Sequence, residues 1–67
     1  MDIRQAIGDQ LHRHRTRRGW SQRVLADKAG ISREYLARLE GGGHEPTLTT
    51  LRRLAKALGV PLTELLR

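Results

Sequence analysis

The feature that most constrains the fold is a connection of only two residues, Gly30 and Ile31, between two short helices. The helices are predicted over 22–29 and 32–40 from their apolar spacing. So short a connection forces them to cross at a steep angle and to pack tightly. Glycine suits the corner because it adopts a positive φ without a steric penalty. The pattern predicts a helix-turn-helix over about 21–40.

Capping and small residues support the same interpretation. Ser21 and Ser32 each precede a helix, where a serine hydroxyl accepts a hydrogen bond from a free backbone N–H. Ala26 is small enough to let the second of these helices come close. Leu36 and Leu39 then fill the space beneath the crossing. These residues are consistent with a tightly packed helix pair.

Further helices are expected on both sides of the motif. One is predicted from about 2 to 17, capped by Asp2, one follows the cap Thr47 and ends at Gly59, and a short one begins at Pro61. No segment shows the apolar alternation of a strand, so we expect an all-α, compact five-helix domain. Apolar positions expected to face the core include Ile3, Ile7 and Leu11 of the first helix, Val24, Leu25, Ala26 and Ala29 of the second, and Leu48, Leu51, Leu54, Ala55 and Leu58 of the fourth.

Length and composition limit the possible functions. The 67 residues predict a single domain over 1–67, and the chain has no cysteine for disulfides or thiolate metal sites. No apolar run is long enough to span a bilayer, and the N-terminus does not resemble a signal peptide, so a cytoplasmic protein is expected. Thirteen Lys and Arg against seven Asp and Glu give a net charge of +6, which favours a nucleic-acid partner.

The stretch from Gly19 to Gly42 resembles the helix-turn-helix of phage Cro and lambda-repressor-type regulators, often called the xenobiotic-response-element family. The continuation from Pro46 to Leu66 resembles the fourth and fifth helices of that family. The resemblance therefore covers nearly the whole chain and implies a lambda-repressor-like DNA-binding domain. The signature positions are Gln22, Leu25, Ala26, Gly30, Ile31, Ser32, Leu36, Leu39 and Glu40.

The resemblance implies that the helix over 32–40 enters the major groove of double-stranded DNA. Its exposed first turn carries Ser32, Arg33 and Glu34, placed to reach base edges. An arginine there donates two hydrogen bonds to guanine, and a carboxylate accepts one from cytosine. Arg38 lies one turn further along the same face and either reads a base or holds a phosphate.

Two residues of this helix each allow two interpretations. Glu34 either contacts a base, or caps the helix and orients Arg33. Tyr35 either packs its ring at the edge of the core, or brings its hydroxyl to a phosphate or its ring to a thymine methyl group. The sequence leaves both choices open.

The start of the preceding helix is expected to hold the DNA backbone. In the family, the residue matching Gln22 binds a phosphate and braces the recognition helix. Ser21 and Arg23 flank it at a helix N-terminus, where free N–H groups favour an anion. The glycine loop of residues 41–43 is expected to offer backbone N–H groups to a phosphate, with Gly43 named for this contact. Family members often carry Asn or Lys there, and this chain has neither, so His44 is the alternative donor.

The resemblance also implies contacts within the protein. Arg15 of the first helix is expected to pair with Glu40 at the end of the recognition helix. The pair would lock this helix to the body of the domain, which makes Arg15 structural first and a phosphate ligand second. Trp20 occupies the position of an apolar anchor between the first two helices, so we expect it in the core.

Metal binding and catalysis are not expected. His12, His14 and His44 are the only candidate metal ligands besides carboxylates, and His12 and His14 point in different directions on a helix. No third ligand accompanies them, and no nucleophile lies beside a base that could activate it. We therefore expect neither a metal, nor a cofactor, nor an enzymatic activity.

A sequence-specific transcription regulator acting as a homodimer on a palindromic operator is the function predicted from these residues. One recognition helix contacts few base pairs, and a two-fold dimer doubles the site. The alternative is a protein-interaction module, such as an antitoxin or adaptor, against which the basic recognition face argues. Apolar residues near the C-terminus either form the dimer interface or close the core: Val60, Leu62, Leu65 and Leu66.

Overall fold

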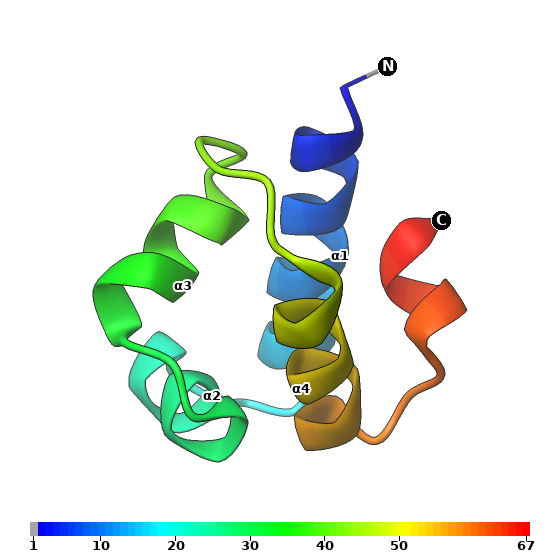
Figure 1. The fold of residues 1–67 in the computed structure, drawn as a ribbon. Helices are drawn as coiled ribbons and strands as arrows, with labels where there is room; N and C mark the ends of the chain where they lie inside the picture. The colour runs from blue at the N-terminus through cyan, green and yellow to red at the C-terminus, as the bar shows by residue number, and fades with distance from the viewer. Residues whose placement is uncertain (1) are drawn as a thin grey trace.

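The computed structural model describes residues 2–67, which form four α-helices and one 3₁₀ turn (Figure 1). The sequence boundaries predicted for the first four elements agree with it closely. Within these residues there is no strand. The elements are α1 (Ile3–Arg17), α2 (Gln22–Ala29), α3 (Arg33–Glu40), α4 (Leu48–Leu58) and the 3₁₀ turn η1 (Leu62–Leu66).

Each α-helix begins at the predicted capping residue. Asp2, Ser21, Ser32 and Thr47 all have extended backbone, and each side chain accepts a hydrogen bond from a backbone N–H two or three residues later. These bonds satisfy donors that the first helical turn leaves unpaired. Local sequence signals therefore determine where the helices start.

The expected fifth helix is wrong in kind. Residues 62–66 form a 3₁₀ turn, in which the N–H of Glu64 donates to the carbonyl of Pro61 at 3.0 Å. The tighter i to i+3 bonding of a 3₁₀ helix is used mainly in short segments such as this one. The segment still buries one leucine, Leu65, as an α-helix would.

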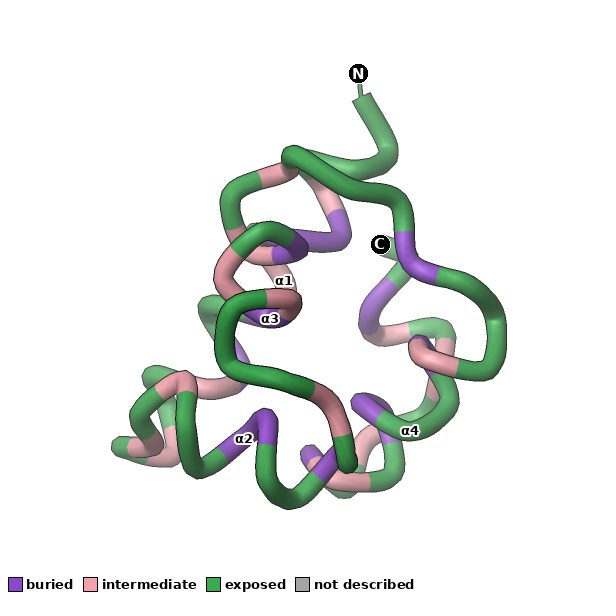
Figure 2. The backbone as a smooth tube through the Cα atoms, turned by 60° about the vertical axis from the view of Figure 1, so that its left-hand side comes forward, coloured by how far each residue is buried: buried purple, intermediate pink, exposed green. Residues whose placement is uncertain are grey.

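The core lies where α1, α2, α3, α4 and η1 meet, and Figure 2 shows the buried positions of these elements facing the interior. Three apolar residues expected there are instead exposed: Ile3 (53%), Leu48 (54%) and Val24 (36%). All three lie within the first three residues of a helix. The buried apolar residues are Ile7, Leu11, Leu25, Ala26, Ala29, Leu36, Leu39, Leu51, Leu54, Ala55, Leu58 and Leu65.

Helix α1 organises the domain, since it packs against α3 on one side and η1 on the other (Figure 1). Its C-terminal end is joined to that of α4 through Arg18, whose guanidinium donates to the carbonyls of His14 and Leu58. These bonds satisfy carbonyls that the helix ends leave unpaired. Among residues 2–67, no helix has the length and apolar character that a membrane crossing requires.

His14 of α1 is the one buried polar residue among those described, with 7% of its surface exposed, and its ring lies near Glu64 of η1. Burial lowers the pKa of its imidazole, and the positive charges of Arg18, Arg17 and Arg13 lower it further, while Glu64 opposes them. The folded protein therefore favours the neutral ring.

We expect this ring to make folding less favourable as the solution becomes acidic. The unfolded chain takes up a proton near the ordinary pKa of about 6.5, before the folded chain does, so stability falls as the pH drops from about 7.5 toward 5.5. His14→Gln should flatten this slope in urea unfolding measured across that range. The matched variant His44→Gln, at an exposed position, should retain it. An unchanged slope in His14→Gln would show that the buried imidazole is not its source.

Candidate nucleic-acid interface

The turn between α2 and α3 has the geometry that the two-residue connection predicts. Gly30 adopts φ 71° and ψ 33°, the left-handed conformation that favours glycine. The N–H of Ile31 donates to the carbonyl of Ala26 at 3.0 Å, which closes the end of α2. Ala26 is 1% exposed beneath the crossing. The turn therefore redirects the chain at once into α3.

Helix α3 presents one face to solvent and buries the other. The hydroxyl of Ser32 accepts from the N–H of Tyr35 at 3.0 Å and fixes the first turn. Arg33, Glu34 and Arg38 are exposed, and the structure leaves their side chains free of ion pairs within residues 2–67. On the opposite face, Leu36 and Leu39 are buried in the core.

The end of α3 is held by an ion pair to α1. Arg15 Nε donates to Glu40 Oε2 at 2.7 Å, and Arg15 Nη2 donates to Glu40 Oε1 at 2.9 Å. This two-point geometry matches the planar guanidinium to the carboxylate. The side chains are only 11% and 6% exposed. The pairing that the resemblance implied is therefore present.

Other groups complete the surroundings of the carboxylate. Gln22 Nε2 donates to Glu40 Oε1 at 3.3 Å, and His12 Nδ1 lies 3.3 Å from the same oxygen. Arg15 Nη1 also donates to the carbonyl of Trp20 at 2.7 Å. The cluster thus joins α1, the segment before α2, the start of α2 and the end of α3. The contact of His12 was not predicted from the sequence, in which the histidines stand out only as candidate metal ligands.

Ionisation of Glu40 follows from these contacts. Burial alone would raise the pKa of its carboxyl group, but hydrogen bonds from Arg15, Gln22 and His12, together with the charge of Arg15, outweigh burial and hold the pKa below its ordinary value. The hydrogen bond to Glu40 in turn raises the pKa of Arg15. The pair is therefore charged at neutral pH.

The start of α2 lies beside this cluster. The hydroxyl of Ser21 accepts from the N–H of Val24 at 3.2 Å, and Arg23 is exposed. Gln22 is partly buried because its amide turns toward Glu40. The bracing role expected of Gln22 is thus visible as a contact to the last residue of α3, while its phosphate contact remains a prediction.

Tyr35 packs against the loop that follows α3. Its ring meets that of His44 edge to face, with centroids 5.3 Å apart and planes 72° apart. Tyr35 is partly buried against the core, and His44 is exposed. The first interpretation of Tyr35, at the edge of the core, agrees with this position. Its contact with DNA remains a prediction.

The glycine loop does not offer the free donors that we expected. The N–H of Gly43 donates to the carbonyl of Arg38 at 3.0 Å, that of Gly42 to Leu39 at 3.2 Å, and that of Gly41 to Ala37 at 3.0 Å. The three N–H groups close the C-terminal end of α3, because its last carbonyls have no partners within the helix. The Gly43 N–H thus already has a partner within the protein. The phosphate contact expected of Gly43 stays a prediction, with His44 as the alternative donor of the loop.

A close helix approach was also missed from the sequence. Gly8 lies in the middle of α1, where the backbone end of α3 comes so near that a Cβ atom would lie 2.5 Å from the Leu39 carbonyl oxygen and 2.7 Å from that of Glu40. The available signal was the glycine itself, because a glycine inside a helix costs stability unless packing requires it.

The helix-turn-helix family model HTH_3 matches residues 11–65. The chain belongs to this family. The resemblance to Cro- and repressor-type regulators is thereby confirmed, and the chain is a DNA-binding transcriptional regulator by family. The matched residues include the turn at Gly30 and helix α3, so the motif lies where it was predicted from the sequence.

Similar proteins support the same assignment. The uncharacterized HTH-type transcriptional regulator y4dJ of Sinorhizobium fredii is 42% identical over 65 residues, covering 97% of this chain and 84% of that protein. The immunity repressor protein of Bacillus phage phi105 is 39% identical over 57 residues, covering 85% of this chain but 40% of the repressor. This chain thus spans most of some relatives and only a part of others.

Solved structures share the fold. The restriction-modification controller protein C.AhdI from Aeromonas hydrophila aligns with a TM-score of 0.90 at 34% identity, covering 92% of this chain and 94% of that one. The hypothetical transcription factor NHTF from Neisseria aligns with a TM-score of 0.94 at 32% identity, covering 98% and 76%. The all-α architecture of this HTH_3 domain is therefore shared with known regulators.

Trp20 packs at the junction of α1 and α2, partly buried against the core as expected. The ammonium of Lys28 lies 4.9 Å and the guanidinium carbon of Arg18 5.8 Å from the ring centroid. Both distances permit cation–π attraction to the indole. These contacts attach the C-terminal end of α1 to α2, which is the first helix of the motif.

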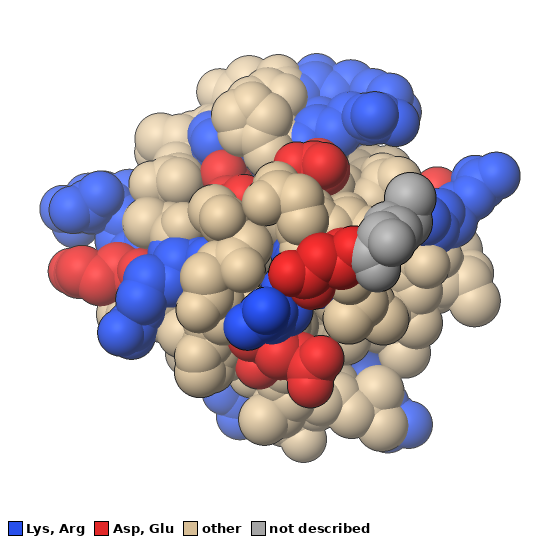
Figure 3. Space-filling view, turned by 90° about the horizontal axis from the view of Figure 1, so that it is seen from above, with Lys and Arg blue, Asp and Glu red and all other residues tan. Residues whose placement is uncertain are grey.

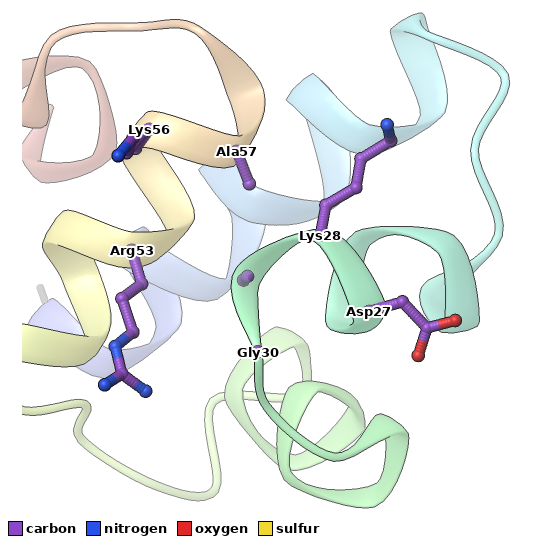
Figure 4. A pocket seen from close by; sticks show the side chains of 7 residues that line it. Asp27, Lys28, Gly30, Arg53, Lys56 and Ala57 are labelled. Carbon is purple, nitrogen blue, oxygen red and sulfur yellow. The ribbon is translucent and has the colours of Figure 1, made fainter.

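A shallow hollow of about 580 Å³ lies between α2 and α4, next to the turn of the motif (Figure 4). Lys28, Arg53 and Lys56 point away from one another there and do not converge on a common point. We therefore assign it no ligand. Within the described part of the chain, no group of three potential metal ligands comes together.

The positive charge is unevenly distributed over the HTH_3 domain. Figure 3 views the molecule from above Figure 1, at the end where the chain begins, and shows Lys and Arg around the rim with several Asp and Glu toward the middle.

Proposed function

We propose that the protein is a sequence-specific transcription regulator that binds double-stranded DNA as a homodimer. Helix α3 enters the major groove of each half of a palindromic operator. The observation that carries the proposal is the division of α3 into an exposed face with Arg33, Glu34 and Arg38 and a buried, ion-paired end at Glu40. A rigidly held helix with free polar side chains suits direct reading of base edges.

The contacts are divided between bases and phosphates. Ser32, Arg33 and Glu34 face the base edges from the first turn of α3, and Arg38 follows behind them. Phosphate contacts come from other exposed or partly exposed groups around this helix. They are Ser21, Gln22, Arg23, Tyr35 and His44. The phosphate contacts position α3, whereas the base contacts select the sequence. A protein acting in this way works in the cytoplasm of a prokaryote or in a phage-infected cell, at the DNA.

Selection from a pool of random duplexes tests the proposal most directly. We expect an enriched palindrome whose half-sites lie about one helical turn, roughly 34 Å, apart, because two copies of α3 must enter successive major grooves on one side of the duplex. Enrichment of no sequence would contradict the proposal and favour a protein-interaction module such as an antitoxin or adaptor.

Removing the side chain of Arg33 should weaken recognition of the selected site. We expect Arg33→Ala to cost about 1–3 kcal/mol of binding free energy and to relax the preference at one base position in each half-site. Arg52→Ala, at an exposed position on α4, removes the same charge and should leave the preference unchanged. Titration of labelled duplexes carrying every base at each position measures both effects. Equal preferences in the two variants would exclude base reading by Arg33.

The proposed dimer interface is revised by the burial of its residues. Leu65 is 0% exposed and closes the core of its own chain, Val60 and Leu62 are partly buried against that core, and Leu66 is 46% exposed. Leu66 and the accessible parts of Val60 and Leu62 are therefore the residues that can contact a second copy. Leu65 packs under them in the core and has no surface to offer.

Placing a charge at this surface should separate the dimer. We expect Leu66→Glu to raise the dimer dissociation constant at least about tenfold, because an unpaired charge in an apolar interface costs more than about 1.4 kcal/mol. Val24→Glu adds the same charge at an exposed apolar position on α2 and should leave association unchanged. Sedimentation of the free proteins measures the constants. A wild-type protein that is monomeric both alone and on its operator would contradict the dimer.

A further inference from the structure

A second hollow lies between α1 and η1 and has no part in the interface described above. Its volume is about 390 Å³. In Figure 1, η1 and α3 lie on opposite sides of α1, so this hollow is remote from the recognition helix. It is lined entirely by polar or charged residues: Gln10, Arg13, His14, Arg17, Glu64 and Arg67.

The lining is built from two elements. Residues 10, 13, 14 and 17 follow the spacing i, i+3, i+4, i+7 and share one face of α1, while Glu64 and Arg67 come from η1 and the residue after it. The spacing of Arg13 and Arg17 is visible in the sequence, but their common wall with η1 is not. The fold adds the second wall.

Charge in the hollow is unbalanced. Three guanidinium groups, those of Arg13, Arg17 and Arg67, surround the single carboxylate side chain of Glu64. Glu64 Oε1 already pairs with Arg67 Nη1 at 3.1 Å. Among residues 2–67, Arg13 and Arg17 have no carboxylate within ion-pair distance. Two guanidinium groups thus line the hollow without a counter-charge.

The imidazole of His14 lies at the base of this cluster. Its side chain is 9% exposed, and its Nε2 atom is 3.9 Å from Glu64 Oε2, too far for a hydrogen bond. The described residues supply no hydrogen-bond partner to this ring. Burial lowers the pKa of the ring first, and the charges of Arg18, Arg17 and Arg13 add to that effect against Glu64. The ring therefore senses the positive charge of the hollow.

We propose that the hollow is a binding site for a small oxyanion of the phosphate class, held by Arg13 and Arg17 of α1 together with Arg67 beyond η1. Guanidinium groups match phosphate oxygens in charge and in planar hydrogen-bonding geometry. The bound anion favours the protonated form of the His14 ring, which then supplies one further N–H donor. The anion bridges α1 and η1, the segment that carries Leu66.

The source of the phosphate group is a free ion or a small phosphate ester. A DNA backbone offers the same chemistry, but the hollow is lined by α1 and η1, whereas α3, which is expected to meet the duplex, lies on the other side of α1 (Figure 1). Inorganic phosphate is therefore the probe, and duplex DNA is tested beside it.

Nuclear magnetic resonance of the His14 ring tests the site in the intact chain. At constant ionic strength, we expect inorganic phosphate to shift the His14 ring signals with saturation, and to raise the pKa of His14, while sodium chloride does not. The double variant Arg13→Gln, Arg17→Gln should weaken the phosphate response at least about tenfold, since it removes both unpaired guanidinium groups. The double variant Arg52→Gln, Arg53→Gln removes the same charge from α4 and should keep the full phosphate response. The His14 ring signals are identified by their absence from the spectrum of the His14→Gln protein.

Three results would overturn the proposal. The first is an equal response to chloride, which would reduce the effect to screening. The second is a full response in the Arg13→Gln, Arg17→Gln protein while its fold, followed by circular dichroism, is unchanged. The third is a His14 shift that depends on protein concentration or on duplex DNA but not on phosphate, which would make the hollow part of a macromolecular interface. None of these results depends on whether the protein selects a palindrome.

Discussion

Replacing Arg15 by methionine is expected to destabilise the protein by about 3 kcal/mol at neutral pH. The substitution leaves the carboxylate of Glu40 at 6% exposure without its two-point partner, and it removes the bond from Arg15 Nη1 to the Trp20 carbonyl. A buried charge without a partner costs far more than an exposed pair contributes. Urea unfolding of the two proteins measures the difference.

The double variant Arg15→Met, Glu40→Leu is the matched control. We expect it to recover a large part of the lost stability, because it removes the buried charge together with its partner. Arg13→Met removes an exposed arginine from the same helix and should change stability by less than about 0.5 kcal/mol. A loss below about 1 kcal/mol in Arg15→Met would mean that the pair behaves like an exposed one.

Lowering the pH should reduce the difference in unfolding free energy between wild type and Arg15→Met. In wild type, the pKa of Glu40 is below its ordinary value, so the pair contributes stability at higher pH and loses it as the pH falls through the folded pKa. Without Arg15, burial favours the protonated carboxyl group. The two unfolding free energies should therefore converge below about pH 4.

Adding one methyl group at Gly8 is expected to destabilise the protein by about 1–3 kcal/mol. Alanine is the better helix former by nearly 1 kcal/mol, so helix propensity alone predicts the opposite sign. The new Cβ would meet backbone carbonyl oxygens of Leu39 and Glu40, which cannot rotate away as a side chain can. Helix α3 must move away from α1, which disturbs Glu40 and lowers DNA affinity as well.

Gly41→Ala provides the comparison for this substitution. Gly41 has φ −81°, and a Cβ there would meet its nearest neighbour, the Ala37 carbonyl oxygen, at an ordinary 3.4 Å. We expect a change of less than about 0.5 kcal/mol in urea unfolding. A more stable Gly8→Ala protein would show that α1 and α3 do not approach as closely as the structure has them.

Much of the fold follows from local signals that are visible in the chain. Ser21, Ser32 and Thr47 mark helix starts because a short hydroxyl side chain satisfies free N–H groups wherever it precedes a helix. Gly30 and Gly59 end α2 and α4 at positive φ. Such effects act within a few residues, so they can be predicted without knowledge of the partner helices.

The errors concern residues whose surroundings come from elsewhere in the chain. Leu48 and Val24 have the right spacing for a core position but lie where no neighbouring element covers them. The N–H groups of the glycine loop already donate to carbonyls of α3. The 3₁₀ form of residues 62–66 was not predicted either, because their apolar spacing is compatible with both kinds of helix.

The two-residue connection at Gly30 and Ile31 by itself determined that this chain forms a helix-turn-helix, and the serine caps determined its helix boundaries, because both act through local backbone geometry. Only the tertiary structure decided how α3 is held. The approach of α3 to Gly8 and the convergence of Arg15, Gln22 and His12 on Glu40 bring together residues from separate helices. Their contacts depend on the packing of whole helices, which no local spacing specifies.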